Sequence, residues 1–191
     1  MNTSTGEFQQ LIQAARVQGL SEDLTLPEEV RAIVGSADQA KRPLTPAELN
    51  QVCAISNADP QVAIQLQDRA DALVEQARSH LLREHPQLVK PGGALHPAER
   101  AKACWRDCWQ FFRVIIYAYV CGRPHFTDPQ GMEALRQLYE RMNVPVLGLN
   151  IALKQLQGLT TAEIGDTDVQ AALTATFEHL HAELNKSAVK T

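Results

Sequence analysis

The stretch from Pro97 to Gly122 constrains the fold more than any other, because it predicts one long helix that is apolar on several sides. Proline suits the first position of a helix, where its missing N–H costs nothing, and Gly122 followed by Pro124 supplies a left-handed cap and a stop. Six of the chain's ten aromatic residues (two Trp, three Tyr and five Phe in all) lie in this stretch: Trp105, Trp109, Phe111, Phe112, Tyr117 and Tyr119. We therefore predict a central, buried helix.

From Cys104 onward, where the aromatic residues of this stretch lie, three charged side chains interrupt it: Arg106, Asp107 and Arg113. A charge taken out of water without a partner is strongly unfavourable, so each of them needs an opposite charge or a polar ligand. We therefore expect the central helix to carry either structural ion pairs or a binding site.

The bulk composition indicates a globular protein with one well-filled core. The chain has 191 residues, of which 45% are hydrophobic and 21% charged. Its net charge is −4, and no block of Lys or Arg appears. A nucleic-acid surface is normally basic, so we do not expect a nucleic-acid partner.

No apolar run reaches the roughly 18 residues of a membrane span, and the first residues lack the pattern of a signal peptide. We expect a soluble, cytoplasmic protein. The four cysteines, Cys53, Cys104, Cys108 and Cys121, are too sparse for a secreted disulfide scaffold. Cys104 and Cys108, at helical i, i+4 spacing, are badly placed to bond to each other. We expect free thiols, or one thiol that carries a group.

Repeated cap-proline pairs mark the starts of several helices, as in Thr45-Pro46, Asp59-Pro60 and Asp128-Pro129. No segment alternates with period two, so the sequence predicts an all-α fold without a sheet. The helices expected besides 97–122 are an amphipathic one within 1–26 that ends near Gly19, then 27–41, 46–55, 60–85, 129–142, 145–158 (stopped by Gly158) and 169–184 (capped by Asp166 or Thr167).

From about Ala32 onward the chain resembles the phycobiliprotein family, and its pattern is nearest to that of allophycocyanin α-type subunits. The motifs that carry the resemblance are Leu44-Thr45-Pro46-Ala47-Glu48-Leu49, Val89-x-Pro91-Gly92-Gly93, Cys104-Trp105-Arg106-Asp107, Leu135-Arg136-Gln137-Leu138-Tyr139 and Val144-Pro145. The resemblance implies a globin-like, bilin-binding domain over 44–191, preceded by an extension and partner-docking helices over 1–43.

The resemblance also implies a light-harvesting protein rather than an enzyme, with a covalently bound phycobilin, most simply phycocyanobilin. Cys104 is the position where the pigment attaches, and Asp107, three residues on, would accept hydrogen bonds from its pyrrole N–H groups. Arg106 fits a pigment propionate, because a guanidinium matches a carboxylate in two-pronged geometry. Further residues implied near the pigment are Arg100 and Lys102 (second propionate), Gln110, Phe111, Tyr117 and Tyr139. We expect no catalytic or metal-binding residues.

Asp38 and Arg113 match the family's partner-docking pair, an aspartate of the leading helices and an arginine on the central helix of the opposite subunit. The implied partners are another phycobiliprotein subunit, a phycobilisome linker, and a bilin lyase that attaches the pigment. The implied place is the cyanobacterial cytoplasm, on the cytoplasmic side of the thylakoid membrane. The segment before Pro27 would extend this interface, dock to a linker or block ring assembly, and the sequence does not choose among these.

Other interpretations follow from the residues alone. Arg106 and Asp107 could form a purely structural ion pair, and a buried cysteine is often only a small apolar residue. His80, His85 and His96 with Cys104 and Cys108 match no compact zinc spacing. The main alternative is a pigment-free module that keeps the family's fold and binds an antenna partner.

Overall fold

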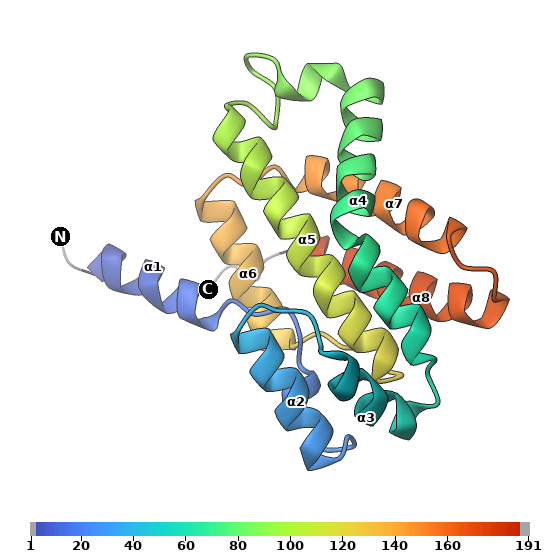
Figure 1. The fold of residues 1–191 in the computed structure, drawn as a ribbon. Coiled ribbons are helices and arrows are strands. Elements are labelled where there is room, and N and C mark those ends of the chain that lie inside the picture. Colours follow the sequence, from blue (N-terminus) through green and yellow to red (C-terminus); the bar gives the residue numbers. More distant parts are fainter. Residues whose placement is uncertain (1–2, 188–191) are drawn as a thin grey trace.

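The computed structural model describes residues 3–187, which are helical apart from their connections (Figure 1). These residues contain no β-strand, only one isolated antiparallel bridge between Gln18 and Thr127. The predicted all-α class is confirmed. None of the helices within 3–187 is both long and apolar enough to cross a membrane. The elements are α1 (Thr3–Ala14), η1 (Leu20–Glu22), α2 (Glu28–Gln39), α3 (Pro46–Ser56), α4 (Pro60–Glu84), η2 (Pro86–Val89), α5 (Ala98–Val120), α6 (Pro129–Arg141), α7 (Val146–Ala162) and α8 (Thr167–Leu184).

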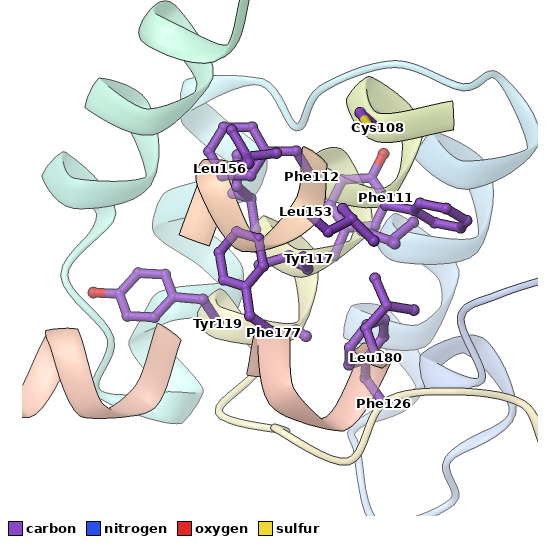
Figure 2. Packing of buried hydrophobic residues seen from close by; sticks show 14 of the residues in the cluster. Cys108, Phe111, Phe112, Tyr117, Tyr119, Phe126, Leu153, Leu156, Phe177 and Leu180 are labelled. Carbon is purple, nitrogen blue, oxygen red and sulfur yellow. The ribbon is translucent and has the colours of Figure 1, made fainter. Parts of the chain in front are cut away.

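Helix α5 is the central element, as the sequence predicts, and it packs against α3, α4, α7 and α8 (Figure 1). Every residue from Phe111 to Cys121 is buried. Phe112 stacks on Phe177 of α8 with ring centroids 6.2 Å apart, among leucines of α7 and α8 (Figure 2). In contrast, between Ala98 and Gln110 only the two cysteines are buried. The helix is therefore enclosed in its second half and open on part of its first half.

The cap-proline signals place the helix starts correctly. Thr45 forms a capping box with Glu48, while Asp59 and Asp128 accept hydrogen bonds from the backbone of the first turns of α4 and α6. Gly122 has φ +61°, which confirms the left-handed cap after α5. A side chain that caps the free N–H groups at a helix start stabilises the helix by about 1 kcal/mol, so these ends are fixed locally.

The predicted stop of α7 at Gly158 is wrong, because the helix continues to Ala162. Glycine in a helix costs about 1 kcal/mol relative to alanine, which tertiary packing can outweigh. Here Leu156 and Thr160, on either side of Gly158, are fully buried, and α7 packs along α4. The helix persists because its buried face continues past the glycine.

The first helix is also shorter than predicted, since α1 ends at Ala14 and not near Gly19. After α1 the backbone bonds to the start of α6: Asp128 N–H donates to the Val17 carbonyl at 2.8 Å, and Arg16 N–H to the Gly131 carbonyl at 3.4 Å. A Cβ on Gly131 would lie 2.3 Å from Cγ of Arg16, so only glycine permits this approach. These contacts, which are remote in sequence, draw the chain out of the helix.

Helix α2 is fastened to α5 by an ion pair between Asp38 and Arg113, whose closest atoms, Oδ1 and Nη2, lie 2.7 Å apart. The Arg113 side chain is only 7% exposed, and it also donates to Gln110 and to the Tyr117 hydroxyl. Gln18 donates to the second Asp38 oxygen at 3.0 Å. A buried charge is tolerated only when it is paired and hydrogen-bonded, and this network meets both conditions.

This ion pair lies within one chain, whereas the family resemblance implied a contact between two subunits. Asp38 and Arg113 satisfy each other without a partner molecule in the structure. A role for these two residues in subunit association stays a prediction.

We expect Asp38→Ala to lower the free energy of unfolding by about 3 kcal/mol, because Arg113 would keep its charge in the interior without an ionic partner. Urea denaturation followed by circular dichroism measures the change. The matched control is Glu75→Ala, which breaks an exposed pair with Arg78 on α4 and should cost less than about 1 kcal/mol. Equal losses in the two variants would show that the Asp38 pair has no structural role.

Candidate functional site

A cavity of about 600 Å³ lies beside the open half of α5. Helix α5 supplies one wall, helix α6 another, and the loop into α7 closes an end with Val144 and Pro145. Two further parts of the chain reach it, α1 through Ile12 and the end of α2 through Lys41. Its volume falls in the range of pockets that bind small molecules and cofactors. The α5 residues that line it are Glu99, Arg100, Ala103, Cys104, Arg106 and Asp107.

Cys104 is the one cysteine within residues 3–187 that lines this cavity. Burial raises the pKa of the Cys53 thiol to about 11 and that of Cys121 to about 12. For Cys108, a hydrogen bond with Cys104 and burial raise the pKa well above its ordinary value. Because the thiolate is the reactive form, the other three cysteines are poor nucleophiles. The site places Cys104 alone against a space that a ligand can enter.

Asp107 lies on the same wall, with its side chain 23% exposed. Its Oδ2 accepts a hydrogen bond from the Tyr139 hydroxyl at 2.9 Å, and its Oδ1 has only Arg106 Nε nearby, at 3.7 Å. Burial raises the pKa of Asp107 above its ordinary value, although the Tyr139 hydrogen bond and Arg106 act in the opposite direction. The carboxylate therefore has unused capacity to accept hydrogen bonds from a ligand.

Cations surround the same space. Arg100, Arg106 and Lys41 line the cavity, against the two carboxylates of Glu99 and Asp107. Arg106 is mostly exposed, and its side chain bends back toward Asp107. The cavity can thus hold a ligand that carries negative groups at its edge and N–H donors in its middle.

The structure brings together five of the residues that the sequence analysis assigned to the pigment: Cys104, Arg100, Arg106, Asp107 and Tyr139. The remaining four do not line this cavity.

Lys102 is exposed on α5, while Gln110 and Phe111 line a neighbouring cavity of about 190 Å³. Tyr117 is fully buried, and its hydroxyl donates to the Arg42 carbonyl. For these four residues a pigment contact stays a prediction without support from the cavity lining.

Sequence reasoning missed several lining residues. The apolar stripe Leu135, Leu138 and Met142 on α6 has helical i, i+3, i+7 spacing and could have been predicted to face α5. Ile12 and Lys41 gave no comparable signal, because nothing local relates them to α5. They are brought to the cavity only by the tertiary fold.

Comparison with known proteins supports the assignment of the family. The family model described as "Phycobilisome protein" matches residues 32–184. The chain is 30% identical over 131 residues to allophycocyanin subunit beta-18 of Nostoc sp., covering 68% of this chain and 78% of the relative. It is 28% identical to allophycocyanin subunit alpha-B of Synechocystis sp., covering 70% and 88%.

A solved structure shares the fold. It is a far-red fluorescent biliprotein derived from a far-red induced allophycocyanin F subunit of the thermophilic cyanobacterium Chroococcidiopsis thermalis. The TM-score is 0.58 at 24% identity, and the match covers 66% of this chain and 96% of the other. The globin-like helical fold expected from the sequence is therefore confirmed. With a family model that spans α3 to α8, the chain belongs to the phycobilisome protein family and is allophycocyanin-like.

Proposed function

We propose that this protein is a light-harvesting phycobiliprotein that carries a phycobilin, phycocyanobilin in the simplest case, bonded to Cys104. The observation that carries the proposal is the cavity in which this thiol and the Asp107 carboxylate, three residues apart on α5, face one space. Light harvesting breaks no bond in turnover, so the protein is not an enzyme.

The residues present fit such a pigment. Cys104 would supply the thiol for attachment beside the apolar residues of the cavity, and its S–H would add across a carbon–carbon double bond of the pigment, the sulfur bonding to one carbon and the proton to the other. Nothing leaves, and no oxidant is required. Leu135, Leu138 and Leu149 supply apolar contacts for the flat ring system. One covalent end and these walls would restrain a pigment that is flexible in solution.

Asp107 would act as the clamp for the pyrrole N–H groups. Its Oδ1 lacks a close hydrogen-bond donor, and its pKa is raised by burial, so donors from a ligand would stabilise the ionised form. Arg106 and Arg100 would pair with the propionates. When bound, the pigment would supply the visible absorption, and Cys104 and Asp107 would restrain it from the α5 wall.

Phycobiliproteins assemble from α and β subunits, and we propose a related subunit as the partner of this chain, with a lyase for pigment attachment. A phycobilisome linker is a further partner that fits the same assembly. The corresponding place is the cytoplasmic face of a cyanobacterial thylakoid.

A pigment-free module that only binds an antenna partner is the alternative. It would need no cavity at Cys104, and the groove would be filled by the protein's own side chains. The cavity of about 600 Å³ and the under-bonded carboxylate inside it favour the pigment.

We expect the chain, co-expressed with phycocyanobilin and a suitable lyase, to give a band with zinc-enhanced fluorescence on a denaturing gel. Cys104→Ala should remove the band, because the thioether cannot form. Cys53→Ala, which removes a buried thiol of α3 that does not line the cavity, is the matched control and should keep the band. A dark band from the parent chain would reject covalent pigment.

We expect Asp107→Ala to leave the pigment attached but to shift its absorption to shorter wavelength and to weaken its emission. The physical reason is that the pyrrole N–H groups lose their acceptor, so that the pigment is held less firmly. Absorption and emission spectra of the purified protein measure both effects. A spectrum equal to that of the parent would exclude the clamp role.

We expect Tyr139→Phe to raise the pKa of Asp107 further in the pigment-free protein, because the carboxylate loses its hydrogen-bond donor. A pKa raised above the ordinary 3.8 means that the folded state binds more protons than the unfolded state just above that pH. The free energy of unfolding therefore decreases as the pH rises from 3.8 through the pKa of the folded state, and Tyr139→Phe should make this decrease larger.

Carboxyl NMR titration measures the Asp107 pKa, and denaturation at several pH values measures the stability. Tyr119→Phe is the control, because Tyr119 is a buried tyrosine of α5 that is not among the groups acting on the Asp107 carboxyl. If both variants titrated like the parent, Asp107 would not be controlled by Tyr139.

A further inference from the structure

Helix α1 forms part of the cavity wall although it lies outside the residues matched by the family model. It packs on α6 and extends away from the body of the protein (Figure 1). Ile12 of α1 and Ala15, which follows it, line the same cavity as Cys104 of α5. Ile12 is 44% exposed, and Met142, which follows α6 at the same cavity, is 54% exposed, so the cavity has an accessible apolar edge. A ligand in the cavity would cover this edge.

The chain fixes this helix in place with contacts at both ends. Arg16 pairs with Asp128 at 2.8 Å, and the close approach of Arg16 to Gly131 anchors the segment that follows α1. Near the start of α1, Glu7 lies 3.6 Å from Arg141 at the end of α6. Polar contacts near both ends of α1 thus hold this helix to α6, and Ile12, which lies between those contacts in the sequence, lines the cavity.

Lys41 reaches the cavity from the end of α2. Its backbone has φ +50°, so the chain turns sharply there, just after Asp38 has been fixed to α5. Within the described part of the chain, the Lys41 ammonium group makes no hydrogen bond or ion pair. A free ammonium group beside a cavity with apolar walls is a binding group for an anion.

We propose that Ile12 and Lys41 complete the pigment site, with Ile12 covering the apolar edge of the tetrapyrrole and Lys41 pairing with one of its propionate carboxylates. This inference rests on the proposed function, because it assigns the ligand to the same cavity. It gives the segment before residue 44 a direct part in pigment binding, in place of a role limited to subunit contacts.

The first test uses the protein without pigment. The alkylation rate of Cys104 by iodoacetamide reports how often the wall opens, and trypsin separates Cys104 from Cys108 by cutting after Arg106. Ile12→Ala should raise the rate about fivefold, because α1 loses its apolar contact at the cavity. Ile55→Ala is the matched control, since this isoleucine of α3 is 48% exposed and away from the cavity. Equal rates in the two variants would show that Ile12 does not restrict access to Cys104.

The second test measures the non-covalent affinity for phycocyanobilin in a Cys104→Ala background. Lys41→Gln should weaken binding about fivefold, because one charged pair is lost. Lys90→Gln is the matched control, since Lys90 is exposed after η2 and outside the cavity lining, and it should bind like the parent. The dimethyl ester of the pigment has no free carboxylates, so Lys41→Gln should not change its affinity.

These outcomes separate the two proposals. Phycocyanobilin that binds equally to the Lys41→Gln and Lys90→Gln variants would overturn the Lys41 assignment and leave the proposed function intact. A parent chain that binds no pigment would reject the proposed function together with the Lys41 pairing. The alkylation rates would still decide whether α1 closes the cavity.

Discussion

The complete burial of α5 along its second half is the constraint on which the rest of the structure depends. Eleven consecutive residues from Phe111 to Cys121 are buried, so neighbouring helices must cover that half on every side. Arg113 lies in this stretch, and because a buried charge needs an ionic partner, α2 packs where Asp38 can pair with it. The first half of α5 is covered less completely, and the cavity beside Cys104 occupies the side that remains open. One helix thus divides into an enclosed structural half and a half that faces a binding site.

The helices were largely predictable because their starts are encoded locally. Thr45, Asp59 and Asp128 bond to the first turn of their own helices, so three or four neighbouring residues suffice to identify these ends. The two errors at helix ends have the opposite cause. At Gly158 and at Ala14 the outcome is decided by packing on α4 and by backbone contacts with α6. Neither contact can be inferred from a short window of sequence.

The cavity residues likewise include some that lie close to Cys104 in the sequence and others that do not. At about 100° per residue, Arg100 and Asp107 lie within about 60° of Cys104 around α5, whereas Lys102 and Tyr117 lie about 160° and 140° away. Helical angle alone does not decide which residues share the cavity, because Arg106 and Glu99 line it although they also lie about 160° and 140° from Cys104. Phe111 points in the same direction as Cys104 but lies two turns along the axis, about 10 Å away. The walls from α1 and α2 are 60 to 90 residues distant in sequence, and only the folded chain relates them to Cys104.

The Asp38–Arg113 ion pair and the cavity are connected through the end of α2 and the turn that follows it. Asp38 is held by Arg113, and three residues later Lys41 reaches the cavity and acts on Asp107 as a positive charge. Because the sharp turn at Lys41 follows directly, a shift of Asp38 would carry Lys41 with it. Movement of Asp38 away from Arg113 would therefore change the charge beside Asp107. The buried ion pair and the cavity are thus joined by a short stretch of backbone, residues 38 to 41, in which the Lys41 N–H donates to the Asp38 carbonyl at 3.0 Å.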